Sequence, residues 1–173
     1  MKKWWLLVLS CVLLSGCQTS MPIWERVEDT LPAAPVGFWQ EDTFQMELEL
    51  PTGLSLETEE DGVRVYSTDD GSMEVQTSMF LTSGLAAAVR SLSGFSLDHV
   101  TVVETTHGPF PEYQFAWYSL TEQGGRLYRA DLIFDGLCCY AVVCSTLEAK
   151  GDLYQAQVQQ VFSSFTLTGE RLV

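Results

Sequence analysis

The chain has 173 residues, and its 23 acidic and 9 basic residues give a formal net charge of −14 at pH 7. A surface this acidic repels nucleic acid and anionic membrane surfaces, so we expect neither to bind directly to the folded protein. A chain of this length can form one domain that buries roughly 68–70% of its unfolded surface, without needing a disulfide or a metal for stability.

Residues 1–16 have the features of an export signal. Lys2 and Lys3 provide a basic start, and an apolar run follows from Trp4 to Leu14. As a helix this run would measure about 16 Å, roughly half of the ~30 Å hydrocarbon core, which favours a cleaved signal over a permanent membrane span. We therefore expect the mature protein to lie outside the cytoplasm.

The segment Leu14-Ser15-Gly16-Cys17 resembles a bacterial lipobox, in which an aliphatic residue and two small residues precede a cysteine. The resemblance implies that Cys17 receives a diacylglyceryl group through a thioether, and that a lipoprotein signal peptidase cuts between Gly16 and Cys17. Thioether formation requires a thiolate nucleophile, and two acyl chains would hold the protein stably on a membrane. Cys11 would be removed with the leader. The alternative is an ordinary secretory signal with a chance cysteine.

Residues 17–43 are predicted to form the lipidated N-terminus and a tether. They contain three prolines and an acidic patch at 25–29, without a sustained apolar period, and would reach roughly 30 Å as a flexible coil. Aromatic residues are unusual in such a linker. We expect Phe38 and Trp39 to pack on the edge of the domain, and the alternative is that Trp24 lies at the lipid interface or contacts a partner.

Residues 44–169 are predicted to form a single α+β domain that begins with an antiparallel meander. Apolar and polar residues alternate in successive segments, a period of two that is typical of strands with one buried face. The alternating segments are 44–50, 54–56, 63–65 and 73–79. Turn sequences rich in Gly, Pro and Asp separate them, and Asp61-Gly62 predicts a tight hairpin.

A helix and a second meander are predicted next. Apolar residues recur at helical spacing over 85–92, with Ser83 as the expected N-cap and Gly94 as the expected end of the helix. The strands then predicted are 100–106, 113–117, 128–134 and 137–144, and a second helix is predicted over 152–163. The whole order predicts one large antiparallel sheet of six to eight strands in two meanders, with two helices packed on it.

The segment 137–144 is apolar on both faces and is predicted to be a central strand covered above and below. Cys138 and Cys144 share one face, but six residues of strand separate them by about 20 Å, too far for a disulfide. Cys139 points to the opposite face. We therefore interpret all three as core thiols, which pack as small hydrophobic groups.

The order of elements over residues 44–168 resembles the Mog1/PsbP fold group. Three motifs carry the resemblance: Leu50-Pro51 in an early extended segment, Gly136-Leu137-Cys138-Cys139-Tyr140 in a late hairpin, and Ser164-Phe165 after the last helix. Members of this group are mostly non-catalytic and bind other proteins. The resemblance therefore implies a binding function without identifying a partner.

No motif predicts a catalytic, cofactor or metal site. Cys139 or Cys144 could act as a nucleophile with His107 as base, but there is no nucleophile elbow, and a histidine followed by Gly and Pro is usually solvated. The acidic clusters at 57–61 and 69–70 lack the spacing of a calcium loop and are interpreted as solvated surface.

We therefore expect a monomeric lipid-anchored protein on the extracytoplasmic face of the cell membrane, or of an outer membrane if the source has one. Its expected role is non-catalytic binding of another envelope protein. The alternative is a carrier or sensor of a small apolar ligand held between sheet and helices, which requires a cavity of several hundred Å³. The aromatic residues that suggest it, and that could equally be core, are Tyr113, Phe115, Trp117, Tyr128 and Tyr140.

Overall fold

The computed structural model describes residues 43–169, which belong to one compact unit of the chain. The predicted signal peptide, the lipidation site Cys17 and the tether aromatics Trp24, Phe38 and Trp39 lie outside the described residues. The predictions made for them therefore remain predictions.

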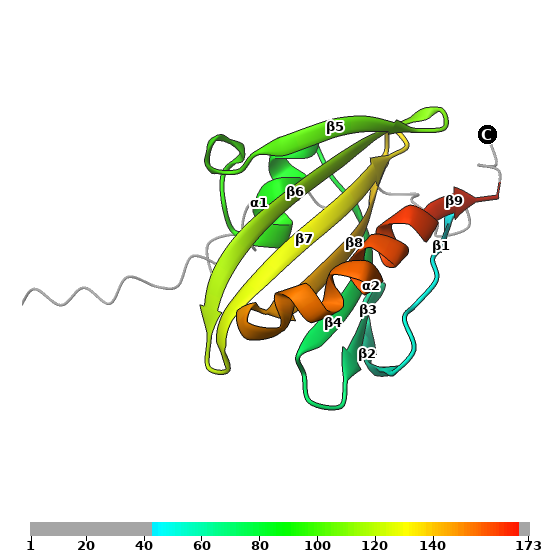
Figure 1. Cartoon of the computed structure of the whole chain (residues 1–173). Coiled ribbons are helices and arrows are strands. Elements are labelled where there is room, and N and C mark those ends of the chain that lie inside the picture. Colours follow the sequence, from blue (N-terminus) through cyan, green and yellow to red (C-terminus); the bar gives the residue numbers. More distant parts are fainter. Residues whose placement is uncertain (1–42, 170–173) are drawn as a thin grey trace, which may run out of the picture. The chain divides into compact units, whose positions relative to one another are not determined.

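A seven-stranded antiparallel sheet forms the centre of the domain (Figure 1). In spatial order its strands are β2 (Leu54–Glu60), β3 (Val63–Thr68), β4 (Met73–Leu81), β8 (Cys138–Leu147), β7 (Gly124–Phe134), β6 (Phe110–Thr121) and β5 (Val102–His107). β2 to β4 form one meander and β5 to β8 form the other, and the pairing of β4 with β8 joins them. The predicted large antiparallel sheet in two meanders is confirmed.

Two helices cover opposite faces of this sheet. α1 (Leu85–Ser93) contributes Ala88 and Val89 to one apolar core, and α2 (Gly151–Ser164) contributes Val158 and Val161 to the other. Short 3-10 helices, η4 (Leu97–His99) and η5 (Glu148–Lys150), precede β5 and α2. The two faces are called here the α1 side and the α2 side. Both predicted helices are therefore present, each with its own core.

Strand β8 is buried on both sides, as the sequence predicts. No residue from Cys138 to Val143 is more than 7% exposed. The α2 side receives Cys138, Tyr140, Val142 and Cys144, and the α1 side receives Cys139, Ala141 and Val143. The prediction was wrong only at Leu137, which lies in the turn before the strand and is 39% exposed.

Helix α1 ends as predicted but begins differently. Gly94 closes it in the left-handed conformation at φ 76°, where its N–H bonds to the carbonyl of Arg90. The predicted N-cap, Ser83, was wrong, because the N-cap position belongs to Gly84 at φ 137°. An L-residue with a side chain rarely adopts that backbone angle, so the glycine fixes the point where the chain turns into the helix.

The largest departure from the sequence prediction concerns residues 43–50, called here the N-terminal arm. Only β1 (Gln45–Glu47) is a strand, and it pairs with β9 (Thr166–Thr168) instead of joining the large sheet. The alternating apolar residues of the arm pack on the α2-side core: Phe44, Met46, Leu48 and Leu50. Alternation correctly predicts which face of the arm is buried, but it carries no information about the strand's partner.

Three sets of hydrogen bonds hold the arm on the α2 side. Besides the pairing of β1 with β9, the amide of Phe44 donates to the Tyr140 hydroxyl at 3.0 Å, and the amide of Glu49 donates to Ser164 Oγ at 2.9 Å. The Tyr140 hydroxyl in turn donates to Asp135 Oδ2 at 2.9 Å. The arm is therefore tied to β8, to the end of α2 and to β9.

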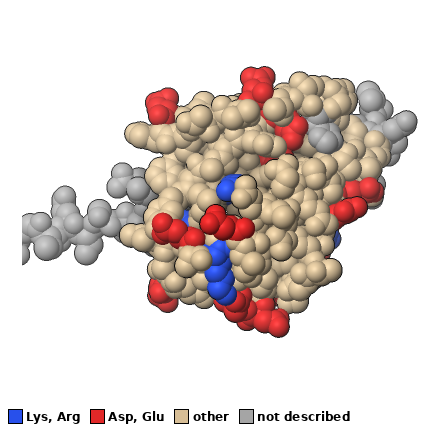
Figure 2. All heavy atoms as spheres, in the orientation of Figure 1, with Lys and Arg blue, Asp and Glu red and all other residues tan. Residues whose placement is uncertain are grey.

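Most of the charged side chains on the surface of the domain are acidic. Figure 2 shows acidic side chains spread around the visible face, with few basic ones among them. Lys150 is paired with Asp70 at 2.6 Å, and both side chains are about half exposed, at 42% and 53%. Among the helices in the described part of the chain, none has the length and apolar character required to cross a membrane.

Replacing Tyr140 with phenylalanine tests how the arm is held. Tyr140→Phe removes a hydroxyl that accepts from the Phe44 amide and donates to Asp135 in a buried setting. We expect the free energy of unfolding to fall by about 1–3 kcal/mol, because the partly buried amide of Phe44 loses its partner. Amide hydrogen exchange should also become faster in the arm.

Tyr113→Phe is the matched control. Tyr113 packs edge-on against Phe134 on the α1 side, and its hydroxyl makes no hydrogen bond to any residue that the structure describes. Equal losses of stability in the two variants, or unchanged exchange in the arm of Tyr140→Phe, would show that the hydroxyl does not hold the arm.

Candidate ligand-binding pocket

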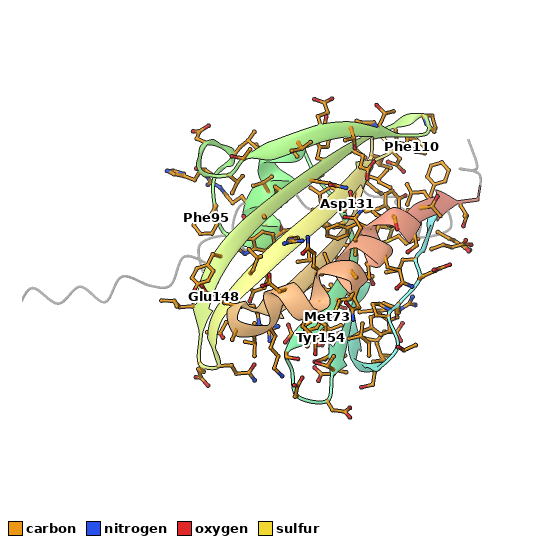
Figure 3. All side chains as sticks on the ribbon, in the orientation of Figure 1. Met73, Phe95, Phe110, Asp131, Glu148 and Tyr154 are labelled. Atoms are coloured by element: carbon orange, nitrogen blue, oxygen red, sulfur yellow. The ribbon has the colours of Figure 1, made fainter. Side chains whose placement is uncertain are left out.

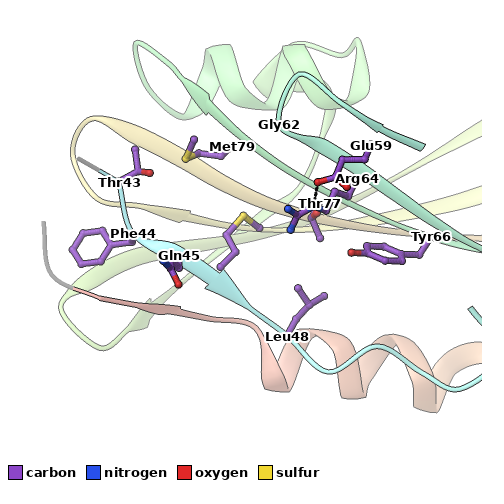
Figure 4. Close-up of a pocket in the computed structure, with 11 residues that line it drawn as sticks. Thr43, Phe44, Gln45, Leu48, Glu59, Gly62, Arg64, Tyr66, Thr77 and Met79 are labelled. Atoms are coloured by element: carbon purple, nitrogen blue, oxygen red, sulfur yellow. Dashed lines mark hydrogen bonds and ion pairs between the residues drawn. The ribbon is translucent and has the colours of Figure 1, made fainter. Parts of the chain in front are cut away.

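A pocket of about 570 Å³ lies on the α2 side, between the N-terminal arm and strands β3 and β4 (Figure 4). This volume lies within the range of small-molecule sites, roughly 300–1,000 Å³. The residues that line it are Thr43, Phe44, Gln45, Met46, Leu48, Glu59, Gly62, Arg64, Tyr66, Thr77 and Met79. They come from the arm, from the β2–β3 hairpin and from β4.

The pocket exists because the cover on the α2 side has two parts. Helix α2 packs over the central strand β8 through Val158 and Val161, and the arm extends the cover toward β3 and β4. The hydrogen bonds of Phe44 and Glu49 run to β8 and α2, and β1 pairs with β9. These bonds fix one edge of the arm, and the space between its other edge and the sheet is left unfilled.

One wall of the pocket is apolar. Its members are partly buried side chains that pack on the α2-side core: Phe44, Met46, Leu48, Tyr66 and Met79. Two of them are methionines, whose unbranched thioether side chains adapt to irregular shapes. This wall is suited to an apolar chain or ring.

The sheet side of the pocket is polar and carries one positive charge. Arg64 Nε donates to Glu59 Oε1 at 2.8 Å, and the two side chains are 55% and 54% exposed. This hydrogen bond, and then the charge of Glu59, raise the pKa of Arg64, so the guanidinium stays protonated. Its two terminal nitrogens make no hydrogen bond to any residue that the structure describes. Figure 4 shows the guanidinium turned toward the middle of the pocket, beside Thr77.

The sequence gives one signal that points to this residue. Arg64 is the only basic residue between Arg26 and Arg90 in the chain. The sequence pattern alone does not single out Arg64, because whether a strand residue faces a pocket or solvent depends on what packs above it. The N-terminal arm packs above Arg64, although the hydrogen bonds of Phe44, Glu49 and β1 in the arm run to β8, α2 and β9 and not to the β2–β3 hairpin.

The aromatic residues that suggested a ligand are mostly on the other side of the sheet. Tyr113, Phe115, Trp117 and Tyr128 belong to the α1-side core, where Trp117 stacks on Phe115 and Tyr128 at 5.3 and 5.0 Å between ring centroids. Tyr140 lies on the α2 side and bonds to the arm. All five are core residues, and none of them lines the pocket.

The three thiols of the domain are buried, as predicted. Cys138 and Cys139 are 0% exposed and Cys144 is 1% exposed. Burial, and then the charge of Asp131, raise the pKa of Cys144 to about 12, and burial raises the pKa of Cys139 as well. The thiolate needed for nucleophilic attack is therefore disfavoured at neutral pH.

The strand that ends at the histidine considered as a base is not a neighbour of the strand that carries these thiols. His107 ends β5, and β8 lies three strands away in the sheet, about 14 Å at ~4.8 Å between strands. The lipidation and cleavage residues, Cys17 and Gly16, lie outside the described residues, so the structure does not place them. The structure places the backbone of His107 three strands away from the strand that carries Cys139 and Cys144.

The acidic clusters are solvent-exposed. Residues 57–61 lie at the exposed tip of the β2–β3 hairpin. Asp70 accepts hydrogen bonds from Lys150 Nζ and from Ser72, and these hold the pKa of Asp70 well below its usual range. Within residues 43–169, no group of three or more His, Cys, Asp or Glu side chains is arranged to hold a metal ion.

One acidic residue, Asp131 of β7, is fully buried on the α2 side (Figure 3). Gln114 Nε2 donates to its Oδ2 at 2.8 Å, while its Oδ1 has no hydrogen-bond partner among the described residues. Burial, and then the charge of Glu112 and a hydrogen bond with it, raise the pKa of Asp131 to about 8. Asp131 is therefore mostly protonated at neutral pH, and it lies outside the pocket lining.

Comparisons with known proteins support the fold. No protein-family model matches the sequence, and no curated protein matches it. Among solved structures, LpqN of Mycobacterium tuberculosis, described as involved in cell envelope biogenesis, aligns with a TM-score of 0.51 at 14% identity. The alignment covers 74% of this chain and 86% of LpqN.

Two further structures align similarly. The PsbP protein of the cyanobacterium Synechocystis sp. PCC 6803 gives a TM-score of 0.52 at 14% identity, covering 81% of this chain and 99% of that one. A protein from Bacteroides thetaiotaomicron gives 0.50 at 11% identity, covering 72% of this chain but only 46% of that one. The domain therefore has the fold of PsbP and LpqN, which confirms the predicted Mog1/PsbP-like architecture.

Titration of Asp131 should make stability depend on pH. Between the ordinary pKa of 3.8 and the folded-state pKa of about 8, the unfolded chain loses this proton and the folded protein keeps it. The free energy of unfolding should therefore fall as pH rises from about 4 to about 8, by at most about 1.4 kcal/mol per pH unit from this group. Asp131→Asn should flatten this decline in urea unfolding measured at pH 5, 6, 7 and 8.

Glu122→Gln provides a control for removing one acidic group, because Glu122 is exposed in the turn between β6 and β7. This variant should keep the pH dependence of the unaltered protein. If Asp131→Asn and Glu122→Gln show the same slope, Asp131 is not the group that makes the folded protein retain a proton.

Proposed function

We propose that this protein is a lipid-anchored, non-catalytic binding module on the extracytoplasmic face of the cell membrane, or of an outer membrane where there is one. The observation that carries the proposal is the segment Leu14-Ser15-Gly16-Cys17, which resembles a lipobox and precedes a compact α+β domain. Diacylation of Cys17 would anchor the chain firmly, because two acyl chains together give stable membrane binding.

The fold supports an envelope role for the domain. LpqN, whose fold this domain shares, takes part in cell envelope biogenesis in a mycobacterium. The expected partner is another envelope protein, and the expected oligomeric state is a monomer. Nucleic acid is disfavoured as a partner by the net charge of −14.

The chemistry of the described residues supports binding over catalysis. The thiols of Cys138, Cys139 and Cys144 are buried, and burial disfavours the thiolate of Cys139 and Cys144. The described residues form instead a pocket beside Arg64, with apolar side chains and one guanidinium in its lining. Its volume of about 570 Å³ favours a second candidate function, the carriage or sensing of a small ligand.

Labelling with a palmitate analogue in growing cells tests the anchor. We expect the protein to incorporate the label, to fractionate with membranes and to begin at residue 17 in its mature form. Cys17→Ser should lose the label and be released from the membrane, because serine cannot form the thioether. Cys11→Ser is the matched control and should be labelled normally, since Cys11 belongs to the leader. Label retained by Cys17→Ser, or a mature N-terminus elsewhere, would contradict the proposal.

Crosslinking on intact cells, followed by mass spectrometry, tests for a protein partner. The anchored protein should capture a small set of envelope proteins. Cys17→Ser should capture them less well, because it is no longer held at the membrane. A wild-type sample with no protein enriched above this variant would argue against a protein-binding role and in favour of the small-ligand candidate.

A further inference from the structure

We propose that the pocket beneath the N-terminal arm binds an amphiphile, a molecule with an apolar chain and a carboxylate or phosphate group, and that Arg64 holds the anionic group. This inference rests on the second candidate function above and specifies its ligand class. It combines three features of the pocket: a guanidinium whose terminal nitrogens bond to no described residue, an apolar wall, and an acidic protein around them.

Arg64 supplies the anion-binding group. Its Nε is engaged with Glu59 Oε1 at 2.8 Å, which leaves the two terminal nitrogens as free donors among the described residues. A guanidinium presents its paired donors in a planar fork that matches the two oxygens of a carboxylate or phosphate. The contact with Glu59 also orients the guanidinium before a ligand arrives, which reduces the entropy lost on binding.

The exposure of this ion pair suits a binding site. Both side chains are about half exposed, so a ligand can reach Arg64 from solvent without breaking a buried pair. Thr77, opposite Arg64 in the β3–β4 register, adds a hydroxyl to the same side of the pocket. Arg64 therefore supplies a solvent-exposed polar group to the site, and the apolar side chains adjoin the core.

The apolar wall accounts for the rest of the ligand. Phe44, Met46, Leu48 and Met79 line the pocket and pack on the α2-side core, so a chain placed against them leaves water. Each methylene buried there adds to affinity. A ligand with only a polar group would leave the apolar side chains of this wall in contact with water.

The charge of the protein argues against a small free anion. The chain carries a net charge of −14, and Glu59 stands beside Arg64, the only cation among the described residues that line the pocket. Inorganic phosphate or acetate would be repelled over the surrounding surface and would gain only the contact with Arg64. An amphiphile gains the apolar contacts in addition, which is why the structure favours it.

The test uses the full chain with Cys17→Ser, so that no acyl group of its own competes for the pocket. The fluorescent fatty acid cis-parinaric acid is the reporter, and unlabelled palmitate and lysophosphatidic acid compete with it. Displacement by one of these two identifies a carboxylate or a phosphate as the preferred group. Hexadecanol and inorganic phosphate, which each provide one half of the ligand, should compete at least about tenfold more weakly.

Substitution of Arg64 gives the decisive comparison. Arg64→Gln should weaken binding of the reporter at least about tenfold, the effect expected when a charge-assisted hydrogen bond is lost. Arg90→Gln is the matched control, because Arg90 is an exposed arginine on α1, on the other side of the sheet. The Arg90→Gln variant should bind the reporter as tightly as the parent chain does. Thermal unfolding of each variant checks that it is folded. Binding should also slow amide exchange in the arm.

Equal binding by Arg64→Gln and the parent chain would overturn the assignment of Arg64. Absence of reporter binding by the parent chain, or equally strong competition by hexadecanol, would overturn the ligand class. These failures are separable from failure of the proposed anchor, because the binding assay uses an unlipidated chain. Loss of palmitate labelling at Cys17 would leave the binding result unaffected.

Discussion

The structure depends on strand β8 being buried on both of its sides. From Cys138 to Val143 it exposes almost no surface, so each side of the sheet must carry its own apolar cover. Helix α1 provides one cover, and α2 with the N-terminal arm provides the other. A sheet covered on one side only would leave a row of apolar side chains in water, and the hydrophobic effect would oppose it.

The two covers differ in a way that produces the candidate site. The arm is a short extended segment held by its pairing with β9, by Tyr140 and by Ser164, and its side chains do not fill the space over β3 and β4. The pocket therefore forms because the α2 side of the sheet is covered by helix α2 and, beside it, by the extended N-terminal arm. Arg64 faces that space because of its register position opposite Thr77.

Much of the fold could be predicted from local patterns. The alternation in β8 assigned Cys138 and Cys139 to opposite sides, and helical spacing located α1 and its end at Gly94. The path of the arm could not be predicted, because alternation shows which face is buried and not which strand is the partner. The position of Arg64 in the pocket could not be predicted for the same reason. Its surroundings depend on contacts between segments that are distant in the sequence.

The most direct test of the account counts the reactive thiols of the mature protein, extracted from membranes in mild detergent. The account predicts none in the folded protein, because on the proposed anchor Cys17 would be alkylated and Cys11 would be removed with the leader, and the other three of the five cysteines are buried. Three should react after unfolding in denaturant. A thiol that reacts rapidly in the folded protein would contradict the double burial of β8, and a fourth after unfolding would contradict the lipid anchor.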